Sequence, residues 1–323
     1  MWKEPIVGVP PSEILPRFDA LRDQGCDLLR ISVPDRDTAE AFGVLAGKSG
    51  LPLVADIHFD HTLALRCMDF PIAKVRINPG TICDEEKVKE VVRKAQGNGI
   101  SLRIGINAGS LPRDLEASPH VAAAMLTAAE REMEILDKFS FQEAVFSLKS
   151  SDVEQTVQAN LLFSAQYDYP LHIGVTEAGP LVEGIVKNTI GVFRLLEKGV
   201  GDTIRISLSA PPHQEVVTGR EILRVMGIGR PGMNLVSCPQ CGRSTFDVQS
   251  FLEIVYPKIH GKNRDITVAI MGCPVNGPGE AKKADLGITG AGNKAILFRK
   301  GTIIRHVTSE EAESAFLQEL DSL

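Results

Sequence analysis

The chain has 323 residues, of which 43% are hydrophobic and 24% are charged, and its formal net charge is −6. This length and composition suit a globular protein with one large and one small domain, and the negative charge argues against nucleic acid or a membrane surface as a partner. Neither a secretory signal nor a membrane-spanning apolar run is visible, so the six cysteines are expected to be reduced thiols in the cytoplasm.

Short β-rich runs alternate with helical patterns up to about residue 225. The expected strands cover residues 6–9, 28–33, 53–57, 74–77, 102–106, 144–148, 171–175 and 203–208. The clearest helical patterns cover residues 12–24, 84–98, 119–139 and 179–198. Eight strand–helix units predict a (β/α)8 barrel over residues 1–226. A doubly wound sheet is the alternative, but no Gly-x-Gly-x-x-Gly turn follows the first strand.

A glycine-rich segment at 227–232 predicts a boundary, and residues 233–323 form a second predicted domain. Its expected elements are a helix at 247–256, strands at 266–270, 295–299 and 302–305, and a helix from 309. This mixture predicts a small α+β domain.

Basic residues occupy five of the expected barrel strands, namely Arg30, Arg76, Arg103, Lys149 and Arg205. Their Val, Ile and Leu neighbours suit the face that packs on helices, so the basic side chains should point into the barrel near its carboxyl end. The same alternation places Asn78, Asn107 and Ser207 on the inner face, and pairs Asp56 with His58. An interior ion pair explains a single arginine equally well. Five cations together predict a phosphate or diphosphate site.

Three cysteines in the second domain predict a metal or cluster site. Cys238 and Cys241 form a Cys-x-x-Cys pair, and Cys273 lies in a Gly/Pro-rich loop. Zinc is the competing interpretation, but a structural zinc site needs four ligands and neither His260 nor His306 is suitably placed. Iron–sulfur clusters are held by thiolates in such loops, and the turn at 276–279 can bring Glu280 toward the same centre. The other three cysteines, Cys26, Cys67 and Cys83, are expected to be incidental thiols.

At these residues the sequence resembles the 4-hydroxy-3-methylbut-2-enyl diphosphate synthase family of isoprenoid biosynthesis. The resemblance rests on Cys-Pro-Gln-Cys-Gly-Arg at 238–243 and Met-Gly-Cys-Pro-Val-Asn-Gly-Pro-Gly-Glu-Ala at 271–281. In the barrel half it continues through Val-Ala-Asp-Ile-His-Phe-Asp (54–60), Val-Arg-Ile-Asn-Pro-Gly (75–80), Arg-Ile-Gly-Ile-Asn-Ala-Gly-Ser (103–110), Leu-Lys-Ser-Ser-Asp (148–152), Gly-Val-Thr-Glu-Ala-Gly (174–179) and Asp-Thr-Ile-Arg-Ile-Ser-Leu (202–208).

The resemblance implies a barrel joined to a small iron–sulfur domain, with a [4Fe–4S] cluster held by Cys238, Cys241, Cys273 and Glu280. It implies two-electron reduction and ring opening of 2-C-methyl-D-erythritol 2,4-cyclodiphosphate, with ferredoxin or flavodoxin as electron donor. It also implies a homodimer in which the cluster domain of one chain caps the barrel of the other.

Proton delivery is expected from Glu280, Asn276 or His58. The expected substrate contacts are Arg30, Asp56, Arg76, Asn78, Arg103, Asn107, Lys149, Glu177, Arg205 and Ser207. One feature departs from the family pattern: the usual Gln-Ser-Met-Thr motif of the first strand is missing from the N-terminal residues. Three alternatives stay open: a non-redox sugar-phosphate enzyme with structural zinc, an electron carrier or cluster scaffold, and an inactive family member.

Overall fold

The computed structural model describes residues 1–323 except 79–84, 230–231, 260–263 and 293. The side chains of Asn276, Pro278 and Glu280 also lie outside the described part of the chain. The chain forms two compact units, Met1–Met226 and Gly227–Leu323. Within the described residues, every helix is too short or too polar to cross a membrane.

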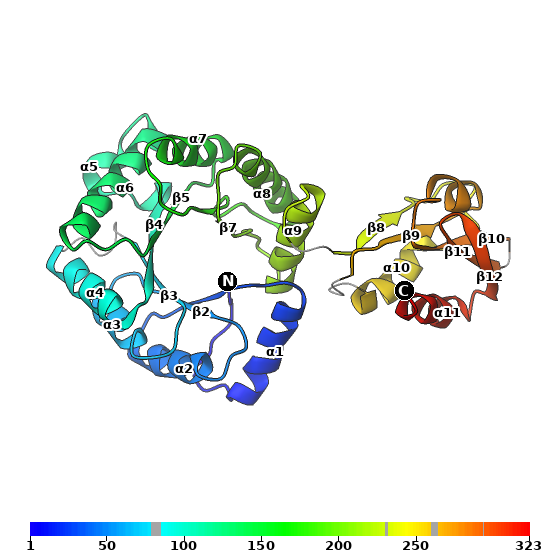
Figure 1. The fold of residues 1–323 in the computed structure, drawn as a ribbon, viewed down its shortest axis with the longest axis horizontal. Coiled ribbons are helices and arrows are strands. Elements are labelled where there is room, and N and C mark those ends of the chain that lie inside the picture. The colour runs from blue at the N-terminus through cyan, green and yellow to red at the C-terminus, as the bar shows by residue number, and fades with distance from the viewer. Residues whose placement is uncertain (79–84, 230–231, 260–263, 293) are drawn as a thin grey trace. The chain divides into compact units, whose positions relative to one another are not determined.

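The first unit is a ring of parallel strands surrounded by helices (Figure 1). Five strands form one sheet in chain order: β1 (Leu29–Ser32), β2 (Leu53–Asp56), β3 (Lys74–Ile77), β4 (Ser101–Asn107) and β5 (Ala144–Lys149). A parallel bridge between Phe146 and Leu171 leads to the pair β6 (His172–Ile173) and β7 (Thr203–Ile204). The expected barrel architecture is therefore confirmed.

Helices follow the strands around the ring. They are α1 (Pro11–Asp23), α2 (Arg36–Ala46), α3 (His61–Cys67), α4 (Glu85–Asn98), η1 (Ala108–Ser110), α5 (Arg113–Glu116), α6 (Val121–Lys138), α7 (Val153–Ser164), α8 (Leu181–Leu196) and α9 (Pro212–Val225). Among the helices whose preceding residue is described, three begin at an aspartate whose carboxylate accepts a backbone N–H of the first turn: Asp35, Asp60 and Asp152. These caps start each helix soon after its strand, which keeps the loops at the carboxyl end short.

The strand expected at 6–9 is wrong, because residues 7–9 form a turn that leads directly into α1. Prolines at 5, 10 and 11 lack an N–H for strand pairing, and Gly8 has a φ of 76°, which breaks the run. The preceding residues lie beside β1 instead. Trp2 N donates to Arg30 O (2.9 Å), and Lys3 Nζ donates to Leu208 O (2.6 Å). A cavity of about 370 Å³ lies between residues 1–7 and the end of β1.

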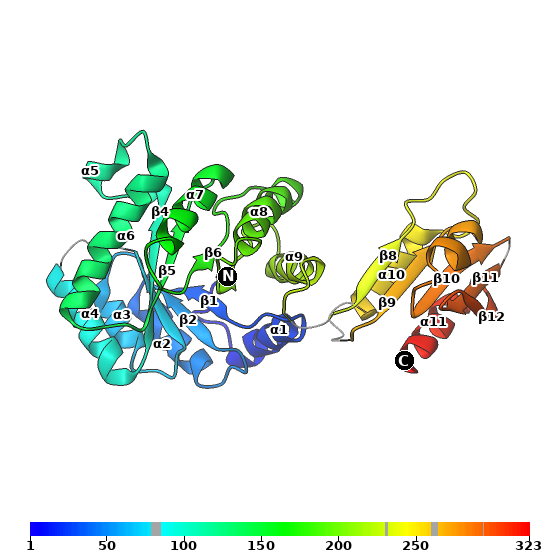
Figure 2. The same cartoon turned by 45° about the horizontal axis from the view of Figure 1, so that its top comes forward.

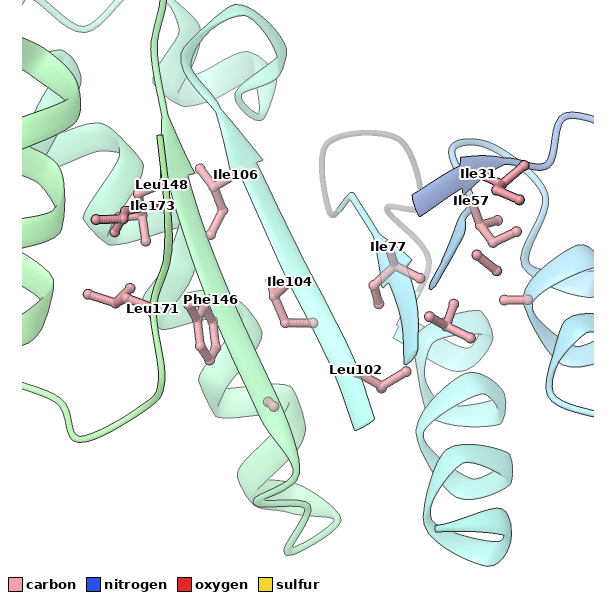
Figure 3. Packing of buried hydrophobic residues seen from close by; sticks show 14 of the residues in the cluster. Ile31, Ile57, Ile77, Leu102, Ile104, Ile106, Phe146, Leu148, Leu171 and Ile173 are labelled. Atoms are coloured by element: carbon pink, nitrogen blue, oxygen red, sulfur yellow. The ribbon is translucent and has the colours of Figure 1, made fainter. Parts of the chain in front are cut away.

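Alternation along the strands separates an apolar layer from a polar interior. Figure 3 shows side chains of the apolar layer, which include Ile31, Ile57, Ile77, Leu102, Ile104, Ile106, Phe146, Leu148, Leu171 and Ile173. Each is nearly inaccessible to solvent, and burying such a side chain stabilises the fold by about 1.5–3 kcal/mol. Because neighbouring residues on a strand point to opposite faces, this packing turns the intervening residues toward the inside of the ring.

The second unit is a five-stranded sheet covered by two helices (Figure 2). The strand order is β12 (Thr302–Thr308), β11 (Lys294–Arg299), β10 (Leu286–Ala291), β9 (Thr267–Met271) and β8 (Asn234–Ser237). Strands β8, β9 and β10 are parallel, while β11 and β12 are antiparallel to their neighbours. Helices α10 (Val248–Ile259) and α11 (Ala312–Asp321) pack against it, and a π-helical turn, η2 (Val275–Glu280), follows β9.

Candidate functional site

The barrel interior collects charged side chains from neighbouring strands. Register pairs Asp56 with Arg76 across β2 and β3, Arg76 with Arg103 across β3 and β4, and Asn107 with Lys149 across β4 and β5. Arg76 is 2% exposed, and Arg103 and Lys149 are each 7% exposed. Parallel-barrel interiors are usually filled by apolar side chains, so this lining indicates a binding function.

Asp56 is the anionic centre of this cluster. Its carboxylate lies 3.1 Å from Arg76 Nη1, 3.3 Å from Arg30 Nη1 and 3.6 Å from His58 Nε2. Burial alone would raise the pKa of Asp56, but the hydrogen bond from His58 and the charges of Arg30 and Arg76 hold it well below its usual value. Asp56 is thus a carboxylate that orients cations, and His58 extends from it toward solvent.

Gly105 gives Arg76 the space that it occupies. The Arg76 guanidinium lies across β4, with Nη2 at 3.5 Å from Gly105 O. A Cβ atom at Gly105 would stand 2.4 Å from Arg76 Nε. Real Cβ contacts essentially never come so close, so a side chain at 105 would displace the guanidinium.

A second carboxylate, Glu215 on α9, holds Arg205. Glu215 is 6% exposed, and its Oε1 lies 3.3 Å from Arg205 Nη2 and 3.1 Å from the backbone N of Leu208. Burial raises the pKa of Glu215, but the charges of Arg205 and the N-terminal amine and the hydrogen bonds from Leu208 N and Lys3 together outweigh this, so the net shift is downward. Glu215 was not predicted as a site residue, because its helical context carries no signal of a contact with the segment after β7.

Arg103 and Lys149 have no such counter-charge among the described residues. In the described part of the chain neither forms an ion pair. Burial and the charges of Arg30 and Arg76 lower the pKa of Arg103, and burial and the charge of Arg103 lower the pKa of Lys149. The buried Nε atoms of Arg76, Arg103 and Arg205 also lack acceptors among the residues that the structure describes. A buried excess of positive charge with open donors fits a polyanionic ligand.

The other residues predicted to contact the substrate differ in how deeply they are buried. Asn78 is buried and donates to Ser110 Oγ (3.1 Å), Ser207 is buried, and Asn107 is half-buried. Glu177 lies exposed on the loop after β6 with a φ of 49°, a strained conformation for a residue with a side chain.

His172 is a further interior residue that was not predicted from the sequence. Its Nδ1 lies 2.8 Å from Thr203 Oγ1, and burial and the charge of Lys149 lower its pKa. It points inward because its neighbour Ile173 belongs to the apolar layer.

In the second unit the cysteine loops follow two adjacent parallel strands. Cys238 comes directly after β8, and its N donates to Ile270 O on β9 (3.0 Å). Cys273 follows β9 and is 3% exposed, whereas Cys241 is exposed. Because carboxyl ends of parallel strands meet at one edge, the three thiols share one end of the sheet.

Hydrogen bonds join the two loops. Thr245 N donates to Gly272 O (2.8 Å), and Ser244 Oγ donates to the same carbonyl (3.2 Å). Gln240 N donates to Cys238 Sγ (3.4 Å). Hydrogen bonds from the backbone and side chain of Arg243 lower the pKa of Cys241, which favours its thiolate.

The donor set suits a soft metal or an iron–sulfur cluster, since three thiols are brought to one edge. The side chains of Asn276 and Glu280 lie outside the described residues. Among the residues that are described, no group of three or more His, Cys, Asp or Glu forms a ready metal site.

Comparison with known proteins agrees with both units. The GcpE TIM-barrel domain matches residues 12–220, and the GcpE protein C-terminal domain matches residues 234–322. A 4-hydroxy-3-methylbut-2-en-1-yl diphosphate synthase (flavodoxin) of Treponema denticola is 48% identical over 100% of this chain and 92% of its own length. The Treponema pallidum protein of the same name is also 48% identical, over 100% of this chain and 85% of its own length.

Among solved structures, Plasmodium falciparum HPPK-DHPS with pterin and p-hydroxybenzoate is similar in fold alone. Its TM-score is 0.50 at 10% identity, covering 69% of this chain and 47% of that one. The sequence matches extend through both units and include the barrel and cysteine motifs. The chain therefore belongs to the GcpE family of 4-hydroxy-3-methylbut-2-en-1-yl diphosphate synthases.

Proposed function

We propose that this chain is an iron–sulfur oxidoreductase of isoprenoid biosynthesis that converts 2-C-methyl-D-erythritol 2,4-cyclodiphosphate to 4-hydroxy-3-methylbut-2-enyl diphosphate. The reaction consumes two electrons and two protons and releases one water. The names of its relatives support this reaction. The observation that carries the proposal is the pair of buried basic side chains, Arg103 and Lys149, which have no acidic partner among the described residues and suit a cyclic diphosphate.

In this proposal the barrel binds the diphosphate. Arg103 and Lys149 supply the charges without partners, while Arg30, Arg76 and Arg205 are oriented by Asp56 and Glu215. Guanidinium groups match phosphate oxygens in pairs and keep their charge in a buried site. The polar side chains Asn78, Asn107 and Ser207 complete the lining. Fixed donors of this kind position the ring without reorganising when it reacts.

Proton transfer is assigned to groups that reach solvent. The His58 side chain is 41% exposed, and Arg76 Nη1 lies 3.3 Å from its Nε2. Asp56 therefore orients an imidazole that can exchange protons with water. Glu177, strained and exposed on its loop, is a second group for steering the substrate or a proton. Asn276 and Glu280 are proposed to act from the second unit.

In the second unit we assign Cys238, Cys241, Cys273 and Glu280 as ligands of a [4Fe–4S] cluster. Such a cluster, when bound, supplies one-electron transfer to the substrate. The thiols at the ends of β8 and β9 support this assignment, and the loop hydrogen bonds hold them in place.

The proposed electron donor is flavodoxin, with ferredoxin as the alternative, because the relatives' names specify flavodoxin. We further assign the active form as a homodimer in which the cysteine unit of one chain serves the barrel of the other. The family resemblance supports this arrangement.

The experiment that tests the cluster assignment uses protein purified without oxygen, with iron, sulfide and zinc measured together. About four iron and four sulfide per chain, with broad absorbance near 400 nm, are expected. Cys273→Ser should lose both the colour and the iron, while Cys67→Ser, a buried thiol of the barrel, should keep them. Zinc in place of iron, or full iron content in Cys273→Ser, would refute the assignment.

A further inference from the structure

The backbone on both sides of Lys149 is held by side chains of helix α7. Before the lysine, Asn160 Nδ2 donates to Leu148 O (2.8 Å). After it, Ser150 N donates to Thr156 Oγ1 (3.0 Å). Asn160 and Thr156 are both completely buried. The two peptide groups that flank Lys149 are therefore fixed by the helix that follows its own strand.

The bond from Asn160 takes the place of strand pairing that is interrupted here. Strand β5 is bridged to the next strand at Phe146 and Leu171. Just beyond the bridge, Gly174 has a φ of 143°, which departs from strand conformation and breaks the regular ladder. Leu148 O lies level with this break and accepts a hydrogen bond from a helix side chain instead of from a neighbouring strand.

Packing alone does not account for an amide at position 160. Asn160 Oδ1 is buried and has no hydrogen-bond partner within the described part of the chain. A buried polar atom without a partner destabilises a fold, and leucine would fill a similar space without one. What the amide adds is the Nδ2 donor, so its role is to hold the backbone rather than to stabilise the core.

The same arrangement recurs on the next helix. Asn188 of α8 is completely buried, its Nδ2 donates to Ser207 O (3.1 Å), and its Oδ1 accepts from Val175 N (3.2 Å). Each asparagine also donates to the carbonyl four residues earlier in its own helix. The backbone groups that they hold lie at the carboxyl ends of the strands, the face on which such barrels bind their ligands.

We propose that Asn160 is a positioning residue for the reaction, which holds the backbone of Lys149 so that the ammonium group meets the diphosphate. Thr156 supports the same backbone from its other side. Lys149 is 7% exposed and forms no ion pair with a described residue, so the backbone that carries it decides where its charge lies. The inference rests on the anion site of the proposed function and adds residues that do not touch the ligand.

The test is a double-mutant cycle on the intact protein, in which calorimetric titration measures the binding of inorganic pyrophosphate and of the cyclodiphosphate. Asn160→Leu should weaken the binding of both anions roughly tenfold, because the ammonium group is misplaced. Its free energy of unfolding should change little, since the substitution removes an unpaired oxygen together with a hydrogen bond. In a Lys149→Met chain the same substitution should weaken binding by less than about twofold, because the group through which Asn160 acts is gone.

The matched control is Asn98→Leu. Asn98 is the last residue of α4, and its Nδ2 also donates to a backbone carbonyl, that of Met68, at 2.8 Å. This variant loses the same kind of bond outside the anion site, so it should bind both anions normally.

Normal binding by Asn160→Leu, or a loss of the same size with and without Lys149, would overturn the inference. Unchanged affinity in Lys149→Met alone would instead refute the anion site of the proposed function, and the role of Asn160 would fall with it. If Asn160→Leu does not fold by circular dichroism, two substitutions of Thr156 decide. Thr156→Val keeps the shape but loses the hydroxyl and should lose affinity, whereas Thr156→Ser should recover most of it; equal affinities in these two variants would contradict the proposal.

Discussion

Adding one methyl group at Gly105 should weaken substrate binding without touching the substrate. The new Cβ would lie 2.4 Å from Nε, 2.8 Å from Nη2 and 3.0 Å from Cζ of Arg76. Strand β4 is hydrogen-bonded on both sides, to β3 and β5, so its backbone cannot easily shift away from Arg76. The Arg76 guanidinium must therefore move, and it leaves its 3.1 Å contact with Asp56.

The loss of affinity follows from the hydrogen bond to phosphate that the displaced Arg76 no longer makes. A charge-assisted hydrogen bond to a phosphate contributes about 1.5–3 kcal/mol, so Gly105→Ala should weaken binding of the cyclodiphosphate roughly ten- to a hundredfold. Overpacking the interior should also lower the free energy of unfolding by about 1–3 kcal/mol.

Calorimetric titration with the cyclodiphosphate, without a reductant, measures the affinity before any turnover. Gly97→Ala is the matched control, since no described atom lies within 4 Å of its Cβ position on α4, and it should bind normally. Unchanged affinity in Gly105→Ala would refute the role given to the Arg76 position.

Three further outcomes are expected. Glu215→Gln removes the charge that orients Arg205, so KM should rise about tenfold with kcat less affected, and Glu215→Asp should recover part of the loss; an unchanged KM would exclude the positioning role. Burial raises the pKa of Glu132 on α6 from its usual 4.5 to about 7, so the unfolded chain releases this proton at lower pH than the folded chain and stability falls as pH rises from about 4.5 to 7. At pH 8 the free energy of unfolding of Glu132→Gln, measured in urea, should therefore be up to about 3 kcal/mol higher than that of the unmodified chain. At pH 4.5 the two values should be nearly equal, and an equal gain at both pH values would contradict the burial argument. Finally, co-expression of Cys273→Ser with Arg76→Ala/Arg205→Ala should restore turnover that each variant lacks alone, and mixed dimers as inactive as both parents would contradict a shared site.

Much of the barrel and its site could be predicted because local patterns determine them. Apolar residues on both sides of Arg76 and Arg103 fix which way these side chains point, and the structure buries both inside the ring. The cysteine loops were recognisable because glycine and proline accompany the thiols in a fixed spacing. Both signals lie within a few residues along the chain.

Features that depend on distant contacts could not be predicted in this way. The run at 6–9 has strand-like composition, but neighbouring prolines and Gly8 turn it into α1. Strand β10 was missed because Gly287 and Gly290 weaken its pattern, and Gly287 is needed where a Cβ would meet the Phe298 ring at 2.1 Å. Glu215 has the sequence context of an ordinary helical glutamate, and only the folded chain brings it to Arg205 and Leu208.

Whether this chain reduces a cyclic diphosphate is decided by measuring its turnover. Protein purified without oxygen should convert the cyclodiphosphate to 4-hydroxy-3-methylbut-2-enyl diphosphate when a reduced viologen dye supplies electrons. Arg103→Met should keep the iron but lose most of the conversion, whereas Cys273→Ser should lose both. An iron-loaded chain that binds the cyclodiphosphate but forms no product under these conditions would contradict the proposed function.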